Sequence, residues 1–191
     1  MRLDAEHVTR RLRLEIPSLR HFDAWVAAHA AAGPPVGEHD VAPRPPAARG
    51  RADFEALIAD LTARRAALRP VWFAVDRGGA LVGTGTIFDV LLGGAWSGNI
   101  GYHVFNHHTG RGHGAEIAGG LVALGFGALG LHRVEACVEP GNAASLRVLS
   151  KVGFRREGRA IGRVLARGAW RDVEVYALTC EERGITWAPP P

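Results

Sequence analysis

The chain has 191 residues, of which 47% are hydrophobic, enough for one well-buried core and short for two. Its net charge of +4 comes from scattered arginines interleaved with acids, without the basic stripe and stacking aromatics that nucleic-acid binding requires, so no nucleic-acid partner is expected. The apolar stretches are too short to span a membrane, and the first residues lack the apolar core of a signal peptide. We therefore expect one cytoplasmic domain over residues 1–191, with its core at about 9–180 and no membrane partner.

The first third of the chain predicts one strand and two helices. Residues 11–16 alternate between polar and apolar side chains, which is typical of a half-buried strand. Apolar residues then recur at helical spacing over residues 18–32 and again over 53–68. Between these helices, residues 33–50 are rich in Pro, Gly and Ala, which indicates an irregular surface loop that is suitably placed to cover an acceptor site.

The rest of the chain alternates strands with helices. Three consecutive antiparallel strands are predicted at residues 71–75, 81–88 and 99–105. A glycine-rich loop then opens a helix over residues 117–129, and the strand at 133–138 is expected to run parallel to 99–105 because a helical crossover joins them. The last elements are a helix and two strands at residues 143–151, 153–157 and 173–178. This order predicts an α+β fold.

The glycine-rich loop predicts a phosphate site. Gly110, Gly112 and Gly114 allow backbone N–H groups to approach an anion, and the following helix adds the unpaired N–H groups and positive dipole end of its N-terminus. A dinucleotide and coenzyme A both suit such a loop. Gly110-x-Gly112-x-x-Ala115 matches the dinucleotide fingerprint, but three antiparallel strands precede it where that fold repeats parallel βα units, which favours coenzyme A.

A second motif supports coenzyme A. Asn142, Ser145 and Lys151 are followed by Gly153-Phe154, and with the loop this pattern resembles the GNAT superfamily of N-acetyltransferases, in particular the Rim-type ribosomal-protein N-terminal acetyltransferases. In that family a [QR]-x-x-G-x-[GA] loop binds the acetyl-CoA pyrophosphate. Here a threonine replaces the Gln or Arg, which removes a side-chain contact and keeps the amide cradle.

The resemblance implies a GNAT fold, a mostly antiparallel twisted sheet with a splayed parallel strand pair and flanking helices. It implies that the strands at 99–105 and 133–138 separate after Val104, where free N–H groups near Val104 and Phe105 hold the thioester carbonyl. Asn142 is expected to cap a helix, to bind pantetheine, or both. The expected acetyl-CoA-binding residues are Val104, Phe105, Thr109, Gly110, Arg111, Gly112, His113, Gly114, Ala115, Asn142, Ser145 and Lys151.

The same resemblance assigns catalytic roles. Many members carry a tyrosine as general acid at the position of Leu149, whereas the Rim-type branch has a serine at the position of Ser145, which inherits that role here. Glu135 is the expected general base because it lies on the strand beside the cofactor. Spacing does not fix this choice, and other candidates for the base remain at Glu116, His103 and His107. Trp170, Arg171 and Asp172 are candidate acceptor contacts, although Asp172 equally suits a turn.

A metal site is an alternative raised by four histidines near the loop, His103, His107, His108 and His113. No acidic or cysteine ligand accompanies them at a known spacing, and no metal is expected.

The motifs and the resemblance together predict an acetyl-CoA-dependent N-acetyltransferase, and the resemblance alone implies that its acceptor is a protein N-terminal amine. A small-molecule amine such as an antibiotic or polyamine, or an acyl-CoA sensor without turnover, remains open. Because many relatives pair, a homodimer is also expected.

Overall fold

The computed structural model describes residues 1–33, 39 and 50–189, which fold around one eight-stranded sheet. The strands are β1 (His7–Val8), β2 (Leu12–Glu15), β3 (Val71–Asp76), β4 (Leu81–Leu91), β5 (Ser97–Val104), β6 (Arg133–Val138), β7 (Arg155–Ala166) and β8 (Ala169–Thr179). The helices are α1 (Phe22–Ala31), α2 (Arg51–Ala66), α3 (His113–Ala123) and α4 (Ala143–Val152). Single helical turns are η1 (Leu19–His21), η3 (Asn106–His108), η5 (Glu181–Arg183) and the π-helical η4 (Leu124–Ala128).

The sheet has the order β1-β2-β3-β4-β5-β6-β8-β7. All neighbouring strands run antiparallel except β5 and β6, which are parallel. The predicted α+β class, with a mostly antiparallel sheet and one parallel pair, is therefore confirmed. The parallel pair is joined through α3, as the crossover rule requires.

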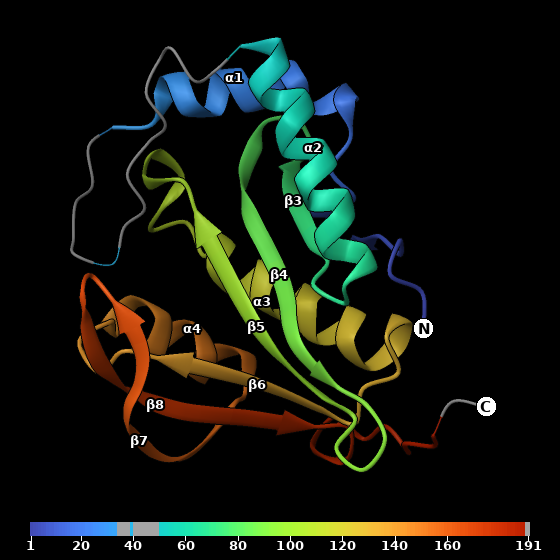
Figure 1. The fold of residues 1–191 in the computed structure, drawn as a ribbon, viewed down its shortest axis with the longest axis vertical. Coiled ribbons are helices and arrows are strands. Elements are labelled where there is room, and N and C mark those ends of the chain that lie inside the picture. Colours follow the sequence, from blue (N-terminus) through green and yellow to red (C-terminus); the bar gives the residue numbers. More distant parts are fainter. Residues whose placement is uncertain (34–38, 40–49, 190–191) are drawn as a thin grey trace.

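The parallel ladder between β5 and β6 is short. It joins Ser97 to Arg133 and ends where Asn99 pairs with Glu135. Beyond that point β5 stays with β4 and β6 stays with β8, so the two strands diverge, as Figure 1 shows. The prediction that they separate only after Val104 is wrong, because each strand follows its antiparallel partner from the third rung onward.

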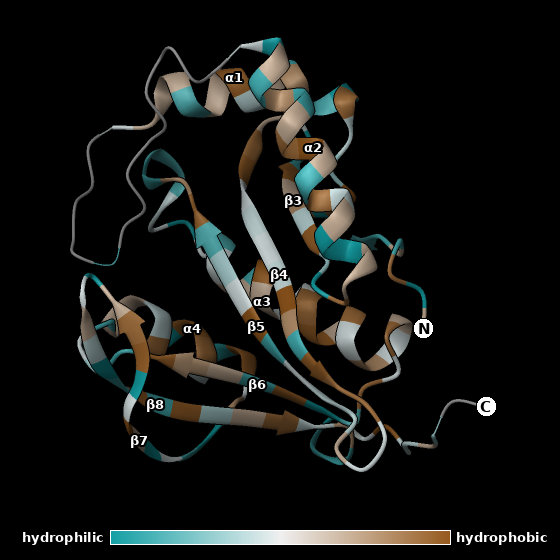
Figure 2. Cartoon of the chain, viewed as in Figure 1, coloured by the Kyte–Doolittle hydropathy of each residue, from teal (hydrophilic) through white to brown (hydrophobic). Residues whose placement is uncertain are grey.

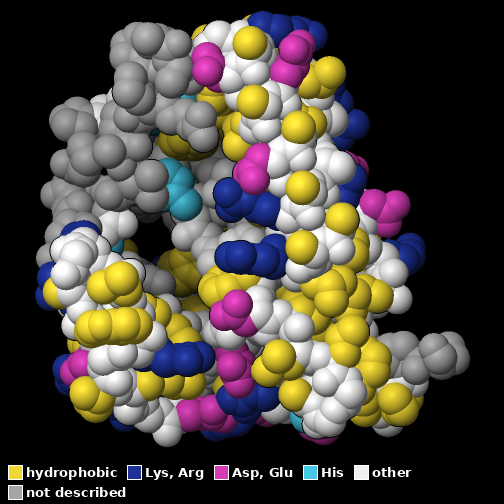
Figure 3. All heavy atoms as spheres, viewed as in Figure 1, with side chains coloured by type: hydrophobic (Ala, Val, Ile, Leu, Met, Phe, Trp, Pro, Cys, Tyr) yellow, Lys and Arg dark blue, Asp and Glu magenta, His cyan; other side chains and the backbone are white. Residues whose placement is uncertain are grey.

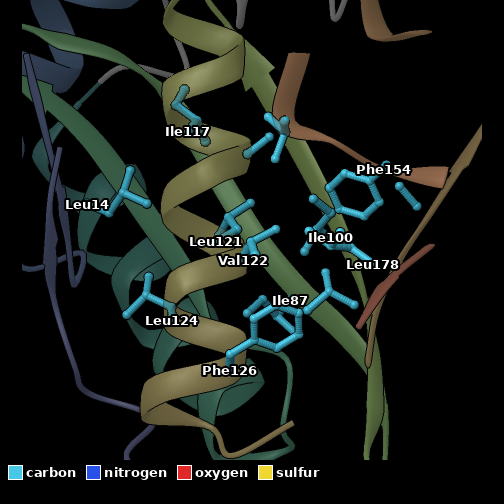
Figure 4. Close-up of a cluster of buried hydrophobic side chains, with 14 of the residues drawn as sticks. Leu14, Ile87, Ile100, Ile117, Leu121, Val122, Leu124, Phe126, Phe154 and Leu178 are labelled. Carbon is cyan, nitrogen blue, oxygen red and sulfur yellow. The ribbon is translucent and has the colours of Figure 1, made fainter. Parts of the chain in front are cut away.

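Helices cover the two faces of the sheet. The main core lies between the strands and α3, where Ile117 and Leu121 of the helix meet Ile87 and Ile100 of the sheet (Figure 4). The helix lies close to β4 because Gly85 has no side chain; a Cβ there would be 3.0 Å from Ile117 and Leu121. Burial of these apolar side chains is the main stabilising contribution to this layer.

A second, aromatic core lies on the opposite face under α1 and α2. Trp25 of α1 stacks at 5.1 Å between ring centroids on Phe54 of α2, and Phe73, Leu81 and Phe105 complete the cluster from the sheet side. Hydrophobic and hydrophilic residues alternate along the ribbon of α2 in Figure 2, and its Leu57, Ile58 and Leu61 pack against this cluster. The two cores hold the end of β5 between them.

Several boundaries differ from those expected. The second helix begins at Arg51 and ends at Ala66, two residues earlier than predicted at each end. β7 and β8 extend far beyond 153–157 and 173–178, because their outer halves pair with each other and leave apolar residues exposed, a pattern that burial periodicity does not reveal. The predicted lid at 33–50 lies outside the described residues except Gly33, His39 and Gly50. No helix of the described ranges is long and apolar enough to cross a bilayer.

One carboxylate ties β2 to the turn that begins α1. Glu15 is 12% exposed and accepts hydrogen bonds from Arg13, Arg20 and His21. Burial alone would raise the pKa of Glu15, but these donors outweigh it and lower the pKa to about 2. The unfolded carboxyl titrates near pH ~4.3, so its contribution to stability is complete above that pH and is lost as the pH falls towards 2.

We therefore expect Glu15→Gln to lower the free energy of unfolding at pH 7 by about 1–3 kcal/mol, because a neutral amide replaces the carboxylate that Arg13, Arg20 and the buried His21 share. The difference from the parent should shrink in acid, which denaturant unfolding at pH 7 and pH 3 would measure. Glu6→Gln is the matched control, since Glu6 pairs with Arg20 at the surface and should change stability little. An equal loss at both pH values would contradict the linkage.

Candidate functional site

A cleft of about 360 Å³ opens where β5, the glycine-rich loop and α4 meet. It brings together residues that lie far apart in the chain. All the residues expected to bind acetyl-CoA line it except Phe105 and Arg111; those that do are Val104, Thr109, Gly110, Gly112, His113, Gly114, Ala115, Asn142, Ser145 and Lys151. Sequence motifs thus located the cleft.

The loop has the backbone geometry of an anion cradle. Gly110 and Gly112 have φ of +73° and +81°, which L side chains rarely adopt, and Gly112 is the N-cap of α3. The first N–H groups of α3 have no partner within the helix, so they are available to an anion together with the positive dipole end. The Thr109 hydroxyl donates to the Asn106 carbonyl at 2.7 Å, so this side chain holds the loop.

Basic side chains surround the cradle. Lys151 and Arg147 of α4 line the cleft beside His108 and His113, whose Nδ1 atoms are buried without a hydrogen-bond partner in the described structure. Burial lowers the pKa of both histidines; His107 and Arg111 add to the effect at His108, and Arg11 and Arg111 add to it at His113. Both rings are therefore neutral at pH 7 and are placed to gain a proton when an anion arrives.

The end of β5 is divided between the two faces of the sheet. The Phe105 N–H donates to the Val82 carbonyl at 3.0 Å, and its ring belongs to the aromatic core, so the expectation that Phe105 binds cofactor is wrong for both amide and side chain. Successive strand N–H groups point to opposite edges. The Val104 N–H therefore points into the gap left by β6, as the predicted carbonyl contact requires.

The start of α4 holds a pair of hydroxyls. Asn142 caps the helix by accepting from the Ser145 N–H at 3.0 Å, as predicted. The Ser145 Oγ lies 2.7 Å from the Tyr102 hydroxyl, and Leu149, where many GNAT members have tyrosine, is fully buried. Sequence reasoning missed Tyr102. Strand alternation offered a signal, because Tyr102 shares a face with Val104 two residues later.

A second cavity of about 280 Å³ lies in the splay itself, between β5, β6 and the β7–β8 hairpin. It shares Tyr102, Asn142 and Ser145 with the cleft, so the hydroxyl pair lies at the boundary of the two spaces. A ligand arm entering from the cradle therefore reaches the splay by passing this pair.

The candidate bases are placed unequally. Glu135 lies at the closed end of the splay and accepts a hydrogen bond from Arg133 at 2.5 Å; it lines neither space. The Glu116 carboxylate is bound by Thr9 and Arg11, and these hydrogen bonds lower the pKa of Glu116 against the effect of burial. His103 lines the cleft, which places it nearer the chemistry than either carboxylate.

The face under α1 and α2 contains a further cavity of about 340 Å³. Figure 3 looks onto this face, which is hollowed between the helices and the β7–β8 hairpin. His103 and Val104 line both this cavity and the cleft. Its walls are mainly apolar, and the one Arg or Lys among the described lining residues, Arg64, forms an ion pair with Asp60 at 2.8 Å.

Asp172 is a candidate for acceptor binding or for a turn, and the four histidines near the loop raise the alternative of a metal site. Asp172 accepts from Arg159 and from the Gly162 N–H, and these bonds fix the bulged hairpin, which supports its turn role. The hydrogen bond from Gly162, then Arg159, lowers the pKa of Asp172. Among the described residues, no group of three or more His, Cys, Asp or Glu side chains is arranged to hold a metal ion, the four histidines near the loop included.

Comparison with known proteins defines the class. The family model described as an acetyltransferase (GNAT) domain matches residues 11–155, so the chain belongs to the GNAT acetyltransferase family. The chain is 40% identical over 98 residues to the probable N-acetyltransferase YjcK of Bacillus subtilis, covering 51% of this chain and 54% of that protein. It is 28% identical over 109 residues to the [ribosomal protein uS5]-alanine N-acetyltransferase of Escherichia coli, covering 57% and 54%. The chain thus spans about half the length of these curated relatives.

Solved structures support the Rim-type resemblance. Mycobacterium smegmatis RimJ, in complex with CoA-disulfide, is 30% identical with a TM-score of 0.73, covering 90% of this chain and 83% of that one. The ribosomal-protein-S5-alanine acetyltransferase of Vibrio fischeri has the same fold, with a TM-score of 0.73 at 21% identity and coverage of 97% and 100%. The expected GNAT fold and Rim-type resemblance are confirmed.

The neutral histidines of the cradle predict pH-dependent binding of coenzyme A. A bound pyrophosphate raises the pKa of His113 from its lowered value in the free protein, so binding takes up a proton and affinity rises as the pH falls from 8 to 6. The carboxylate of Glu116 and the cations of Arg11 and Arg111 also face His113.

Calorimetric titration of coenzyme A at several pH values would test this. We expect His113→Asn to show a shallower pH dependence than the parent, by at most about one decade of affinity per pH unit. Titration of the ligand's own phosphate is common to both proteins and cancels in the comparison. Parallel pH profiles would remove His113 from the linkage.

Proposed function

We propose that this protein transfers the acetyl group of acetyl-CoA to a primary amine by direct attack within a ternary complex. The observation that carries this proposal is that an anion cradle, a splayed strand pair and a hydroxyl pair meet at two adjoining spaces that share Tyr102, Asn142 and Ser145. Membership of the GNAT family supports the same reaction. No step of the proposed reaction requires a metal ion.

The parts of the cleft suit successive parts of acetyl-CoA. The amides of Gly112, His113 and Gly114 face the pyrophosphate, and Lys151 supplies a cation nearby. The pantetheine arm lies along β5 in the gap left by β6, where it replaces the missing strand. The Val104 N–H donates a hydrogen bond to the thioester oxygen and stabilises the negative charge that develops on it.

The chemistry needs a neutral amine and a proton for the departing sulfur. The amine nitrogen attacks the thioester carbon, the carbonyl oxygen becomes an oxyanion, and the C–S bond then breaks with its electron pair on sulfur. Ser145 donates a proton to that sulfur. The nitrogen loses one proton to water or to a base. His103 lines both the cleft and the cavity under α1 and α2, so it is better placed for this role than Glu135.

The proposed acceptor is a protein N-terminal amine. Among the similar proteins, the Escherichia coli enzyme is named for an alanine of ribosomal protein uS5. The cavity under α1 and α2 meets the cleft at His103 and Val104, so an amine at that junction places the adjoining residues of its peptide in the cavity. Its described lining residues include no carboxylate, which disfavours a polyamine.

The cradle is tested by Gly112→Glu. A glutamate at position 112 would need a backbone φ of +81°, which strains a residue that has a side chain. Its carboxylate would also repel the pyrophosphate, which costs roughly 4 kcal/mol at a separation of about 4 Å in an intermediate dielectric. We expect coenzyme A affinity to fall by more than about a hundredfold in calorimetry. Gly79→Glu is the matched control, because Gly79 has φ +89° and open space around it in the β3–β4 turn and does not line the cleft. Equal loss in both variants would count against the cradle.

The acceptor is tested by turnover with a panel of amines, followed through release of coenzyme A. Peptides with a free N-terminus and an apolar first residue should exceed spermidine in kcat/KM by at least about tenfold, because the cavity offers apolar walls and no described carboxylate. The same peptides with a blocked N-terminus and an internal lysine should be inert. Preference for spermidine would favour a small-molecule acceptor, and binding of acetyl-CoA without turnover of any amine would favour a sensor.

A further inference from the structure

The hydrogen bond between Tyr102 and Ser145 links two elements that the catalytic cleft depends on. Tyr102 lies on β5 and Ser145 on the first turn of α4, and their hydroxyl oxygens are 2.7 Å apart. The Tyr102 hydroxyl also lies 3.4 Å from the Ser145 carbonyl oxygen. Both residues line the cleft and the splay cavity, so a thioester sulfur passing between the two spaces meets this pair.

The orientation of Tyr102 is fixed by its neighbours. Gly101 faces the other side of the sheet, where a Cβ would lie 3.2 Å from Thr86, so strand alternation turns Tyr102 towards α4. The Tyr102 ring packs against the main core and is only partly exposed. Burial raises the pKa of Tyr102, although the bond with Ser145 lowers it, so the phenol carries its proton at pH 7.

Hydrogen counting then determines the direction of the bond. A serine hydroxyl has one proton to donate and lone pairs to accept. If the single proton of Ser145 is directed at the departing sulfur, Ser145 cannot also donate to Tyr102, and Tyr102 must be the donor between them. A hydroxyl that accepts a hydrogen bond is a stronger donor in turn, because bonds in a chain polarise one another.

We propose that Tyr102 is a positioning residue that aims the Ser145 hydroxyl at the sulfur of acetyl-CoA. This inference rests on the proposed acetyl transfer. As the C–S bond breaks, the electron pair goes to sulfur and the Ser145 proton moves to it. Tyr102 keeps its own proton and donates a hydrogen bond throughout. Ser145 is restored because the attacking nitrogen releases one proton, through water, for each proton that the sulfur gains.

A double-mutant cycle tests the dependence of one residue on the other. We expect Tyr102→Phe to lower kcat about tenfold and Ser145→Ala about a hundredfold, while the dissociation constant of acetyl-CoA changes less than about threefold. The double variant should be no slower than Ser145→Ala, because Tyr102 acts through Ser145. Tyr176→Phe is the matched control, since Tyr176 also packs against the main core, lies outside both spaces and should leave turnover unchanged.

Multiplicative losses in the double variant, or an equal loss for Tyr102→Phe in kcat and in acetyl-CoA affinity, would overturn the proposal. A binding measurement keeps the pair testable without turnover. The parent should bind coenzyme A more tightly than desulfo-coenzyme A, and both single variants should lose this preference. If the preference is present and is lost in Tyr102→Phe while no amine is acetylated, acetyl transfer fails and the pair stands. If amines are acetylated and Tyr102→Phe changes neither kcat nor the preference, the pair fails.

Discussion

The divergence of β5 and β6 is the constraint on which the rest of the structure depends. Two parallel strands that stay paired satisfy each other's N–H and C=O groups and leave no room for a ligand. Here pairing ends at Asn99 and Glu135, so free backbone groups line a gap inside the sheet. An added extended chain satisfies such groups with its own, which is why a pantetheine arm suits the gap. The glycine-rich loop, the Tyr102–Ser145 pair and the cavity under α1 and α2 all lie around this gap.

The closed end of the gap is held by charge. Arg133 binds both Glu135 and Glu157, and Arg155 binds Glu157 and Glu182, so an arginine–carboxylate network joins β6 to β7 and to the turn after β8. The carboxylate expected to act as a base is thus part of this clamp. Beyond this fixed vertex, pairing of β5 with β4 and of β6 with β8 holds the open ends of the two strands apart.

The sequence predicted what short-range patterns determine. The order of elements from β2 onward, the glycine-rich loop and the Asn142 cap follow from local periodicity and turn chemistry, and apart from the outer halves of β7 and β8 each lies within a few residues of its predicted place. The point of strand divergence was misplaced by five residues, because it depends on which partner each strand follows. The Tyr102–Ser145 bond joins residues 43 apart in the sequence, and nothing local in either segment signals the other.

Asn106 joins the two ligand spaces at one residue. Its side chain exchanges two hydrogen bonds with the Gly33 backbone, at 3.2 and 2.7 Å, and its carbonyl accepts both the amide and the hydroxyl of Thr109. Gly33 follows α1 and lines the cavity under α1 and α2, whereas Thr109 begins the glycine-rich loop and lines the cleft. Asn106 therefore ties the segment after α1 to the loop that begins the cradle. On the proposed function, an acceptor that shifts the segment after α1 would also shift the loop at the pyrophosphate, so the affinities for acceptor and acetyl-CoA would be linked.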